Sequence, residues 1–347
     1  MCNNTKTKRK ISLANNTIVF SLISIFLGLI VGAIALAIAG FNPIEAYSVM
    51  IDGIIGKPKY IVWTFIKATP LILTGLSVAF AFKTGLFNIG AEGQFIVGAL
   101  TATLVGYGLH LPAIIHIPLT LIAAAVAGAC WGGFAGFLKS KFGVNEVIST
   151  IMLNWIAFYL NNYMIMKPWL REGNSEASHL INESASISID WLTGLIGPAT
   201  KANWGIVIAI ILVFIIAFVL FKTTLGYELR GVGYNKFGAE YGGINIKSSI
   251  FKSMAIAGGL AALAGAVQVL GVTHNITVLA APEGNGFDGI AVALIANSNP
   301  IGVIFSGILF GALKYGGTKM QSVGAPSEVI SNNQDQMSLL HSISTCY

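Results

Sequence analysis

The sequence contains few charged residues. Only 10% of its 347 residues are Asp, Glu, Lys or Arg, against about 25% in soluble domains. Apolar residues make up 55% of the chain, and its mean hydropathy is +0.76. A chain with so little charge cannot cover a soluble core with a polar surface. The composition therefore predicts an integral membrane protein in contact with lipid.

Motifs for catalysis and metal binding are also lacking. The three cysteines have no paired spacing, and the five histidines form no HExxH motif and have no cysteine partners in a metal-site pattern, so neither a disulfide framework nor a metal site is predicted. The sequence has no GxxxxGK[ST] phosphate loop and no GxSxG nucleophile motif. We therefore expect no catalytic residues, no cofactor and no ATP hydrolysis by this chain, which is predicted not to be an enzyme.

The excess of basic residues does not indicate a nucleic-acid partner. The formal net charge is +6 and the sequence pI is about 9.1. Most lysines and arginines lie in the segments between apolar runs, and they form no continuous basic block. Membrane lipid is the expected partner of such a surface, and no nucleic acid is expected.

Long apolar runs make up most of the chain. A membrane-spanning helix needs about 20 apolar residues, and inside a bilayer its backbone polar groups must be bonded within the segment. The sequence therefore predicts an all-α fold, a polytopic transmembrane helical bundle in residues 17–330 with broken or half helices and about 8–9 spans. The last run is interrupted at residues 297–300, which either separate two half-helices or kink one. The runs are residues 17–40, 61–82, 86–109, 114–138, 144–166, 205–221, 250–271 and 286–314.

The positions of lysine and arginine predict which segments are cytoplasmic, because these residues are enriched on that side of a membrane. The basic N-terminus, residues 1–16, and the segment 223–249 are predicted to be cytoplasmic. Residues 167–203 have no basic excess and are predicted to form an external loop. We therefore expect a multi-pass protein whose N-terminus is cytoplasmic.

Two segments bring polar residues into apolar surroundings, residues 85–94 (GLFNIGAEGQ) and residues 282–302. Apolar segments interrupted by glycine are typical of solute sites in transporters. Polar side chains in such segments either line a solute path or cap and join helices. Both interpretations apply to Asn88, Glu92, Gln94, Asn154 and Gln268.

The predicted cytoplasmic segment 223–249 is too polar to span a membrane and too long for a tight turn. Within it, residues 236–241 are predicted to form a short helix between Gly233 and the pair Gly242 and Gly243. Glycines at both ends would let such a helix move as a unit and transmit motion from a cytoplasmic motor. A solvated loop is the alternative interpretation.

Several stretches of sequence carry a family resemblance. They are GLFNIGAEGQFIVGA, NEVISTIMLN, LGYELRGVGYNKFGAEYGGI, and GFDGIAVALI followed by NPIGVIFSGILFGAL, within residues 61–330. In this order they resemble the permease family of ABC importers that includes branched-chain amino acid, ribose and nucleoside permeases, and they look most similar to its nucleoside branch. The resemblance implies a permease subunit in the bacterial cytoplasmic membrane. It would move a small polar solute, a nucleoside first and a sugar next, by alternating access.

The same resemblance implies partners. They are a cytoplasmic ATP-binding subunit that uses ATP, a second permease subunit related to this chain, and an external solute-binding lipoprotein. Members of the family dock a coupling helix on the ATP-binding subunit at the place occupied here by residues 235–244. By resemblance, ATPase coupling is assigned to Lys236, Gly238, Ala239, Glu240 and Gly243.

The chain departs from the family after Ile330. Where family members continue with another hydrophobic helix, residues 331–347 form an aberrant polar tail, SNNQDQMSLLHSISTCY, that resembles the product of a frameshift.

An ion-coupled secondary transporter or channel is the alternative function. Such proteins carry paired ionisable residues within their spans. Glu92 and Asp288 are the acids expected inside the apolar runs here, and the sequence predicts no basic partner for either.

Overall fold

The computed structural model describes residues 17–197 and 200–321 and is helical in this part, with three isolated β-bridges and no strand. The expectations for residues 1–16 and 331–347 lie outside the described residues. The helices are α1 (Thr17–Ile38), α2 (Pro43–Ile55), α3 (Pro58–Lys83), α4 (Ala91–Gly108), α5 (Ala113–Phe142), α6 (Glu146–Ile165), η2 (Glu183–Ala185), α7 (Asp190–Ile196), α8 (Gly205–Lys222), α9 (Thr224–Tyr234), α10 (Lys236–Tyr241), α11 (Ile246–Gln268), η3 (Val269–Thr273), α12 (Asn285–Ile295) and α13 (Pro300–Met320).

Each apolar run found in the sequence contains a helix, so the prediction of a helical bundle is confirmed. In the described part of the chain, five helices are long and apolar enough to cross a membrane, namely α3, α5, α8, α11 with η3, and α13, and Phe26–Ile38 of α1 is a shorter apolar helix. Helices α4 and α6 have 18 and 20 residues but contain several polar side chains, which lower their hydropathy. The span count of about 8–9 therefore stays a prediction.

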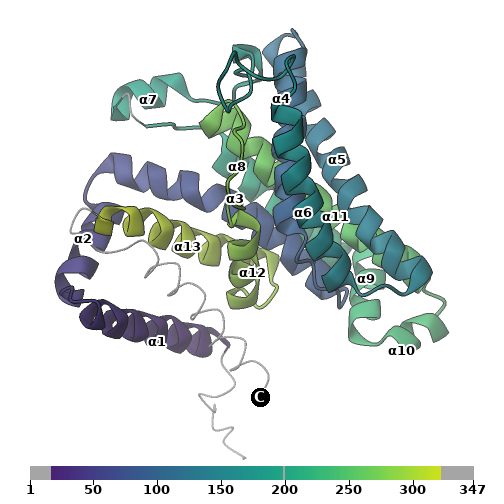
Figure 1. Ribbon diagram of the computed structural model, residues 1–347. Helices are drawn as coiled ribbons and strands as arrows, with labels where there is room; N and C mark the ends of the chain where they lie inside the picture. Colours follow the sequence, from purple (N-terminus) through teal and green to yellow (C-terminus); the bar gives the residue numbers. More distant parts are fainter. Residues whose placement is uncertain (1–16, 198–199, 322–347) are drawn as a thin grey trace, which may run out of the picture.

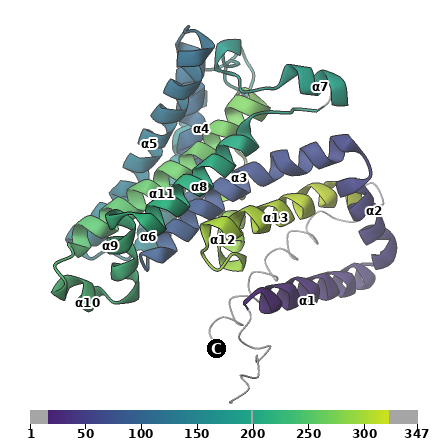
Figure 2. The same cartoon turned by 180° about the vertical axis from the view of Figure 1, so that it is seen from behind.

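Helix α11 lies at the centre of a tight group formed with α4 and α5 (Figures 1 and 2). Glycines permit this contact, because a Cβ atom at Gly98 would lie 2.0 Å from the carbonyl oxygen of Ala262, and one at Gly258 would lie 2.2 Å from that of Gly128. Small residues let membrane helices approach backbone to backbone. The many glycines of the sequence thus fix which helices are neighbours.

Helix α3 joins this group to a second one. It packs against α11 on one side and against α12 and α13 on the other, and α2 lies against α13. Helix α1 stands apart from the bundle and contacts α2 (Figure 2). The Tyr47 hydroxyl of α2 donates a hydrogen bond to the carbonyl oxygen of Leu29 in α1 at 2.6 Å.

Residues 297–299 end one helix and start another, which decides between the two interpretations of this break. Asn297 and Ser298 have φ of 49° and 52°, so the chain leaves the right-handed helical conformation there. Asn299 then caps α13 by accepting a hydrogen bond from the Ile301 N–H at 3.0 Å. Helix α13 folds back on α12, where the Ser306 hydroxyl donates to the carbonyl oxygen of Val292 at 2.9 Å.

The segments predicted to lie on opposite sides of the membrane are found at opposite ends of the bundle. In Figure 1, α7 and the chain around it lie at the top, whereas α9 and α10 lie at the bottom. Residues of the predicted external loop pair with the extended segment 274–284, because the Ser178 N–H donates to the carbonyl oxygen of Ile276 at 2.9 Å. Which end of the bundle is cytoplasmic stays a prediction.

Candidate solute pocket and coupling surface

The buried carboxylate of Glu92 caps the start of α12. Its two oxygens accept hydrogen bonds from the backbone N–H groups of Gly284 at 2.8 Å and Gly286 at 2.5 Å. A Cβ atom at Gly286 would lie 2.2 Å from the backbone nitrogen of Glu92, so the close approach requires glycine there. An acid at this place satisfies free amides and interacts favourably with the positive end of the helix dipole. Glu92 therefore joins α4 to α12.

Asn88, Gln94 and Asn154 extend the same polar network. The side-chain amides of Asn88 and Gln94 bond each other reciprocally, at 2.9 Å and 3.2 Å. The Asn154 side chain, from α6, accepts from the Gly93 N–H at 2.8 Å and donates to the carbonyl oxygen of Ile89 at 3.0 Å. All of these side chains are buried. Four of the five residues predicted for the solute path are thus brought together, and they hold the turn between α3 and α4.

An ion pair joins α12 to α13. The Lys314 Nζ lies 2.6 Å from Asp288 Oδ2 and 3.0 Å from Asn285 Oδ1, and the two charged side chains are 28% and 20% exposed. The expectation that Asp288 lacks a basic partner was therefore wrong. The partner was missed because it lies 26 residues along the chain and meets Asp288 only when α13 folds back on α12.

Replacing Lys314 is expected to destabilise the protein. Lys314→Met leaves Asp288 unpaired, and we expect a loss of about 2 kcal/mol, below the cost for a fully buried pair because both side chains keep some solvent. Removing both charges in Asp288→Asn with Lys314→Met should restore part of this loss. Thermal melting in detergent measures it, with the exposed Lys247→Met as the matched control. Equal melting temperatures for Lys314→Met and the unmodified protein would contradict the assignment.

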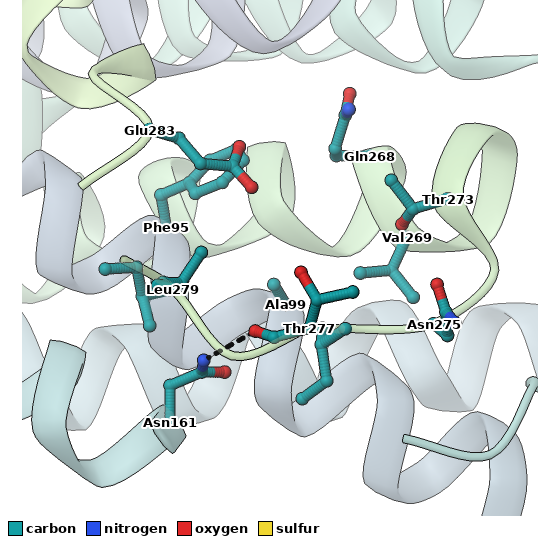
Figure 3. A pocket seen from close by; sticks show the side chains of 12 residues that line it. Phe95, Ala99, Asn161, Gln268, Val269, Thr273, Asn275, Thr277, Leu279 and Glu283 are labelled. Carbon is teal, nitrogen blue, oxygen red and sulfur yellow. Dashed lines mark hydrogen bonds between the residues drawn. The ribbon is translucent and has the colours of Figure 1, made fainter. Parts of the chain in front are cut away.

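Gln268, the fifth predicted residue, lies elsewhere, in a pocket between α4, α6, the end of α11 and the segment 274–284 (Figure 3). The pocket has a volume of about 80 Å³, which admits water but is smaller than a site for an organic solute. The other notable side chains of the pocket were not predicted from the sequence, although Glu283 lies within the polar segment 282–302. These side chains are Phe95, Asn161, Thr273, Asn275, Thr277 and Glu283.

The wall of this pocket is held by asparagines at the end of α6. Asn161 donates to the carbonyl oxygen of Thr277 at 3.3 Å, a bond drawn in Figure 3. Asn162 bonds both backbone groups of Leu279, each at 2.9 Å. These bonds satisfy backbone groups of an extended segment whose other backbone partners are the few residues of the predicted external loop that pair with it.

At the other end of the bundle, α10 has the bounds predicted for the short helix 236–241. Asn235 caps it by accepting from the Gly238 N–H at 3.0 Å. Gly243 follows it with φ of +83°, a conformation that disfavours any residue with a Cβ atom. Of the residues assigned to coupling, Ala239 is buried, and the exposed ones are Lys236, Gly238, Glu240 and Gly243.

Exposed aromatic side chains surround α10. Tyr234, Phe237 and Tyr241 are 90%, 85% and 97% exposed. Large apolar side chains gathered on one surface mark a site of protein contact. These aromatic residues were not predicted as part of the coupling surface, although aromatic residues in an otherwise polar segment are a usable signal.

Helix α9 lies directly against the turn between α3 and α4. A Cβ atom at Gly233 would lie 2.2 Å from the carbonyl oxygen of Lys83, so the two backbones are in contact. Beside this contact the Ser253 hydroxyl donates to the hydroxyl of Thr84 at 2.9 Å. The α9–α10 segment is therefore packed against the same turn that the network of Asn88 and Glu92 holds.

Apolar helices of membrane-spanning length, an internal polar network and a pocket between the helices define a membrane transport protein. The part of the chain described holds no group of three or more His, Cys, Asp or Glu side chains suited to a metal ion. Residues 60–337 match the family described as the permease component of the branched-chain amino acid transport system. The chain belongs to this family, so the family resemblance is confirmed. Its members are transporter permeases and not enzymes.

Proteins similar to the chain include named ABC transporter permeases. The guanosine permease NupP of Bacillus subtilis is 43% identical over 89% of this chain and 88% of its own length. The nucleoside permease NupB of Lactococcus lactis is 38% identical over 89% of this chain and 86% of its own length. The glucose permease TsgB13 of Haloferax volcanii is 31% identical over 89% of this chain and 82% of its own length. The chain also resembles a second permease from each of the first two organisms, NupQ at 29% and NupC at 26% identity. No solved structure matches the chain significantly.

Proposed function

We propose that this protein is the membrane-spanning subunit of an ABC importer for nucleosides. The observation that carries the proposal is the similarity to NupP and NupB over 89% of this chain. A sugar is the second candidate solute, because TsgB13, a glucose permease, is 31% identical over the same share. Transport would proceed by alternating access, with the solute passing the pocket at Gln268 beside the network of Asn88, Glu92, Gln94 and Asn154.

The proposed complex contains three further proteins. A second permease related to this chain would complete the membrane part, as the pairs of similar permeases in two organisms suggest. A cytoplasmic ATP-binding subunit would supply the energy, and an external lipoprotein would deliver the solute. The N-terminus would be cytoplasmic and residues 167–203 external, in the membrane of a bacterial cell.

The coupling surface would be the exposed end of the bundle at α9 and α10. An ATP-binding subunit that moves α10 would also move α9, whose Gly233 contacts the backbone at Lys83. From there the turn between α3 and α4 leads to Glu92, which holds the start of α12. This chain of contacts offers a physical route from ATP hydrolysis to the pocket, and coupling measurements decide whether it is used.

Reconstitution tests the proposed function. With the second permease, the ATP-binding subunit and the lipoprotein in proteoliposomes, we expect guanosine uptake to require ATP and to persist after proton and sodium gradients are collapsed. Uptake driven by an ion gradient without ATP would instead support the secondary transporter. Uptake of glucose and not of guanosine would favour the sugar candidate.

Replacing Gly243 is expected to uncouple the transporter. Gly243→Val places a β-branched residue at φ of +83° and should displace the end of α10. We expect uptake to fall at least tenfold and Glu240→Ala to weaken it as well, while both proteins still insert in the membrane. The matched control is Gly194→Val, since a Cβ atom there meets nothing within 4 Å. Normal uptake by the Gly243 and Glu240 variants would contradict the coupling assignment.

A further inference from the structure

The pocket at Gln268 is lined by polar side chains with free hydrogen-bonding capacity. Within the described ranges, the side chains of Gln268, Thr273, Asn275 and Thr277 make no hydrogen bond to another residue. Phe95 adds an aromatic ring to the lining. Figure 3 shows Glu283 and Phe95 at one end of the pocket and Thr273 and Asn275 at the other. Such a lining, apolar with a few convergent polar groups, is typical of a site for a small organic solute.

Glu283 lies deep relative to the predicted span. Two residues after it, the carbonyl oxygen of Asn285 accepts a hydrogen bond at 2.9 Å from Thr74, which lies in the interior of α3. A charged group at this depth is stable only when it faces water or polar partners. Glu283 is exposed in this chain, so the helices around it do not enclose its carboxylate.

The neighbouring acidic side chains have hydrogen-bond or ion-pair partners for their carboxylates, whereas most of the hydrogen-bonding capacity of Glu283 is unused. Glu92 accepts from two backbone amides, and Asp288 is paired with Lys314. In the described part of the chain, Glu283 has no cation within 4 Å, although Lys67 and Lys314 act on it electrostatically from farther away. It accepts one hydrogen bond, from Asn285 Nδ2 at 2.9 Å. An ionised carboxylate has about four acceptor sites, so most of its capacity remains unused.

We infer that Glu283 is a specificity-determining residue, whose carboxylate accepts two hydrogen bonds from adjacent donors on a neutral solute. A ribose offers such a pair in its vicinal 2′- and 3′-hydroxyls, and a guanine base in its N1–H and 2-amino groups. Phe95 provides an apolar ring for the rest of the solute, and Gln268 an amide that both donates and accepts. The negative charge of Glu283 disfavours phosphorylated solutes, so nucleosides enter and nucleotides do not. This inference rests on the proposed function.

Since the closed pocket is smaller than a nucleoside, its walls must separate for the solute to enter. The segment 274–284 is the wall that can move without breaking a helix, because it is extended. It is held by side-chain bonds from Asn161 and Asn162 and by backbone bonds to residues 176–181 of the predicted external loop, with which it would move. Glu283 lies at the end of this segment, next to the start of α12. Binding at its carboxylate is therefore connected to the position of α12 and of Glu92.

The test compares Glu283→Gln with the unmodified chain in the complete reconstituted transporter. The uptake KM is measured for guanosine, inosine, 2′-deoxyguanosine and glucose, with guanosine monophosphate as a competitor. The same lipoprotein serves both forms, so its own selectivity cancels in the ratio of variant to unmodified values. The matched control is Glu172→Gln, an exposed carboxylate in the predicted external loop. Melting temperatures of the purified proteins establish that each variant folds.

We expect Glu283→Gln to raise the KM for guanosine about tenfold, the effect of losing one charge-assisted hydrogen bond, with kcat little changed. If the variant loses only the preference for guanosine over inosine, the guanine base binds at Glu283. If it loses only the preference for guanosine over 2′-deoxyguanosine, the ribose binds there. An unchanged KM and unchanged selectivity overturn the inference, as does a fall in kcat alone, which indicates a structural role. If the unmodified complex imports neither guanosine nor glucose, the proposed function fails and the inference fails with it.

Discussion

Gly98→Leu is expected to leave no folded permease in the membrane. At Gly98 a Cβ atom would lie 2.0 Å from the carbonyl oxygen of Ala262, and at Gly265 one would lie 2.0 Å from that of Phe95. The obstacle in both cases is backbone, so α4 and α11 would have to separate. Separation removes the close packing that holds membrane helices together, at a cost of several kcal/mol. This approaches the whole stability of a typical protein, roughly 5–15 kcal/mol.

Size-exclusion chromatography of a fluorescent fusion measures this effect as the height of the monodisperse peak. The matched control lies at the end of the same helix, since a Cβ atom at Gly108 meets nothing within 4 Å. We expect Gly108→Leu to give a normal peak and Gly98→Leu to give none. Equal peaks for the two variants would contradict the packing of α4 on α11.

The helices could be predicted from the sequence because each depends on local information. Apolar runs predicted the positions of the long helices, for example α5 and α8. The short helix at 236–241 was predicted with its bounds. Hydrophobicity, caps and glycines act over a few residues, so they can be recognised without knowledge of the fold.

The candidate site was less predictable because it depends on distant parts of the chain. Glu92 was singled out, but its partners Gly284 and Gly286 lie 192 and 194 residues away. Asp288 was expected to have no basic partner, but in the folded chain α13 places Lys314 beside it. Glu283 was not selected from a segment rich in polar residues, since nothing local distinguishes a capping acid from one that faces a pocket.

Glu92→Ala is expected to abolish uptake by releasing the start of α12. The substitution leaves the N–H groups of Gly284 and Gly286 without acceptors in the interior. It also removes the favourable interaction of the acid with the positive end of the helix dipole. Each unsatisfied amide costs about 1–3 kcal/mol, and the dipole interaction adds up to about 2 kcal/mol. We therefore expect a total loss of about 2–8 kcal/mol, a large part of the stability of a typical protein.

Two further variants separate this role from a general loss of charge. Glu92→Gln keeps an oxygen for one of the two amides, so its melting temperature should fall between those of Glu92→Ala and the unmodified protein. Glu45→Ala removes an exposed acid from the first turn of α2 and should change neither melting nor uptake. If Glu92→Ala melted normally but bound solute weakly, Glu92 would act on the solute and not on α12. The same result would move the solute path from the pocket at Gln268 to the junction of α4 and α12, because a carboxylate not needed by the helix would then be free to bind.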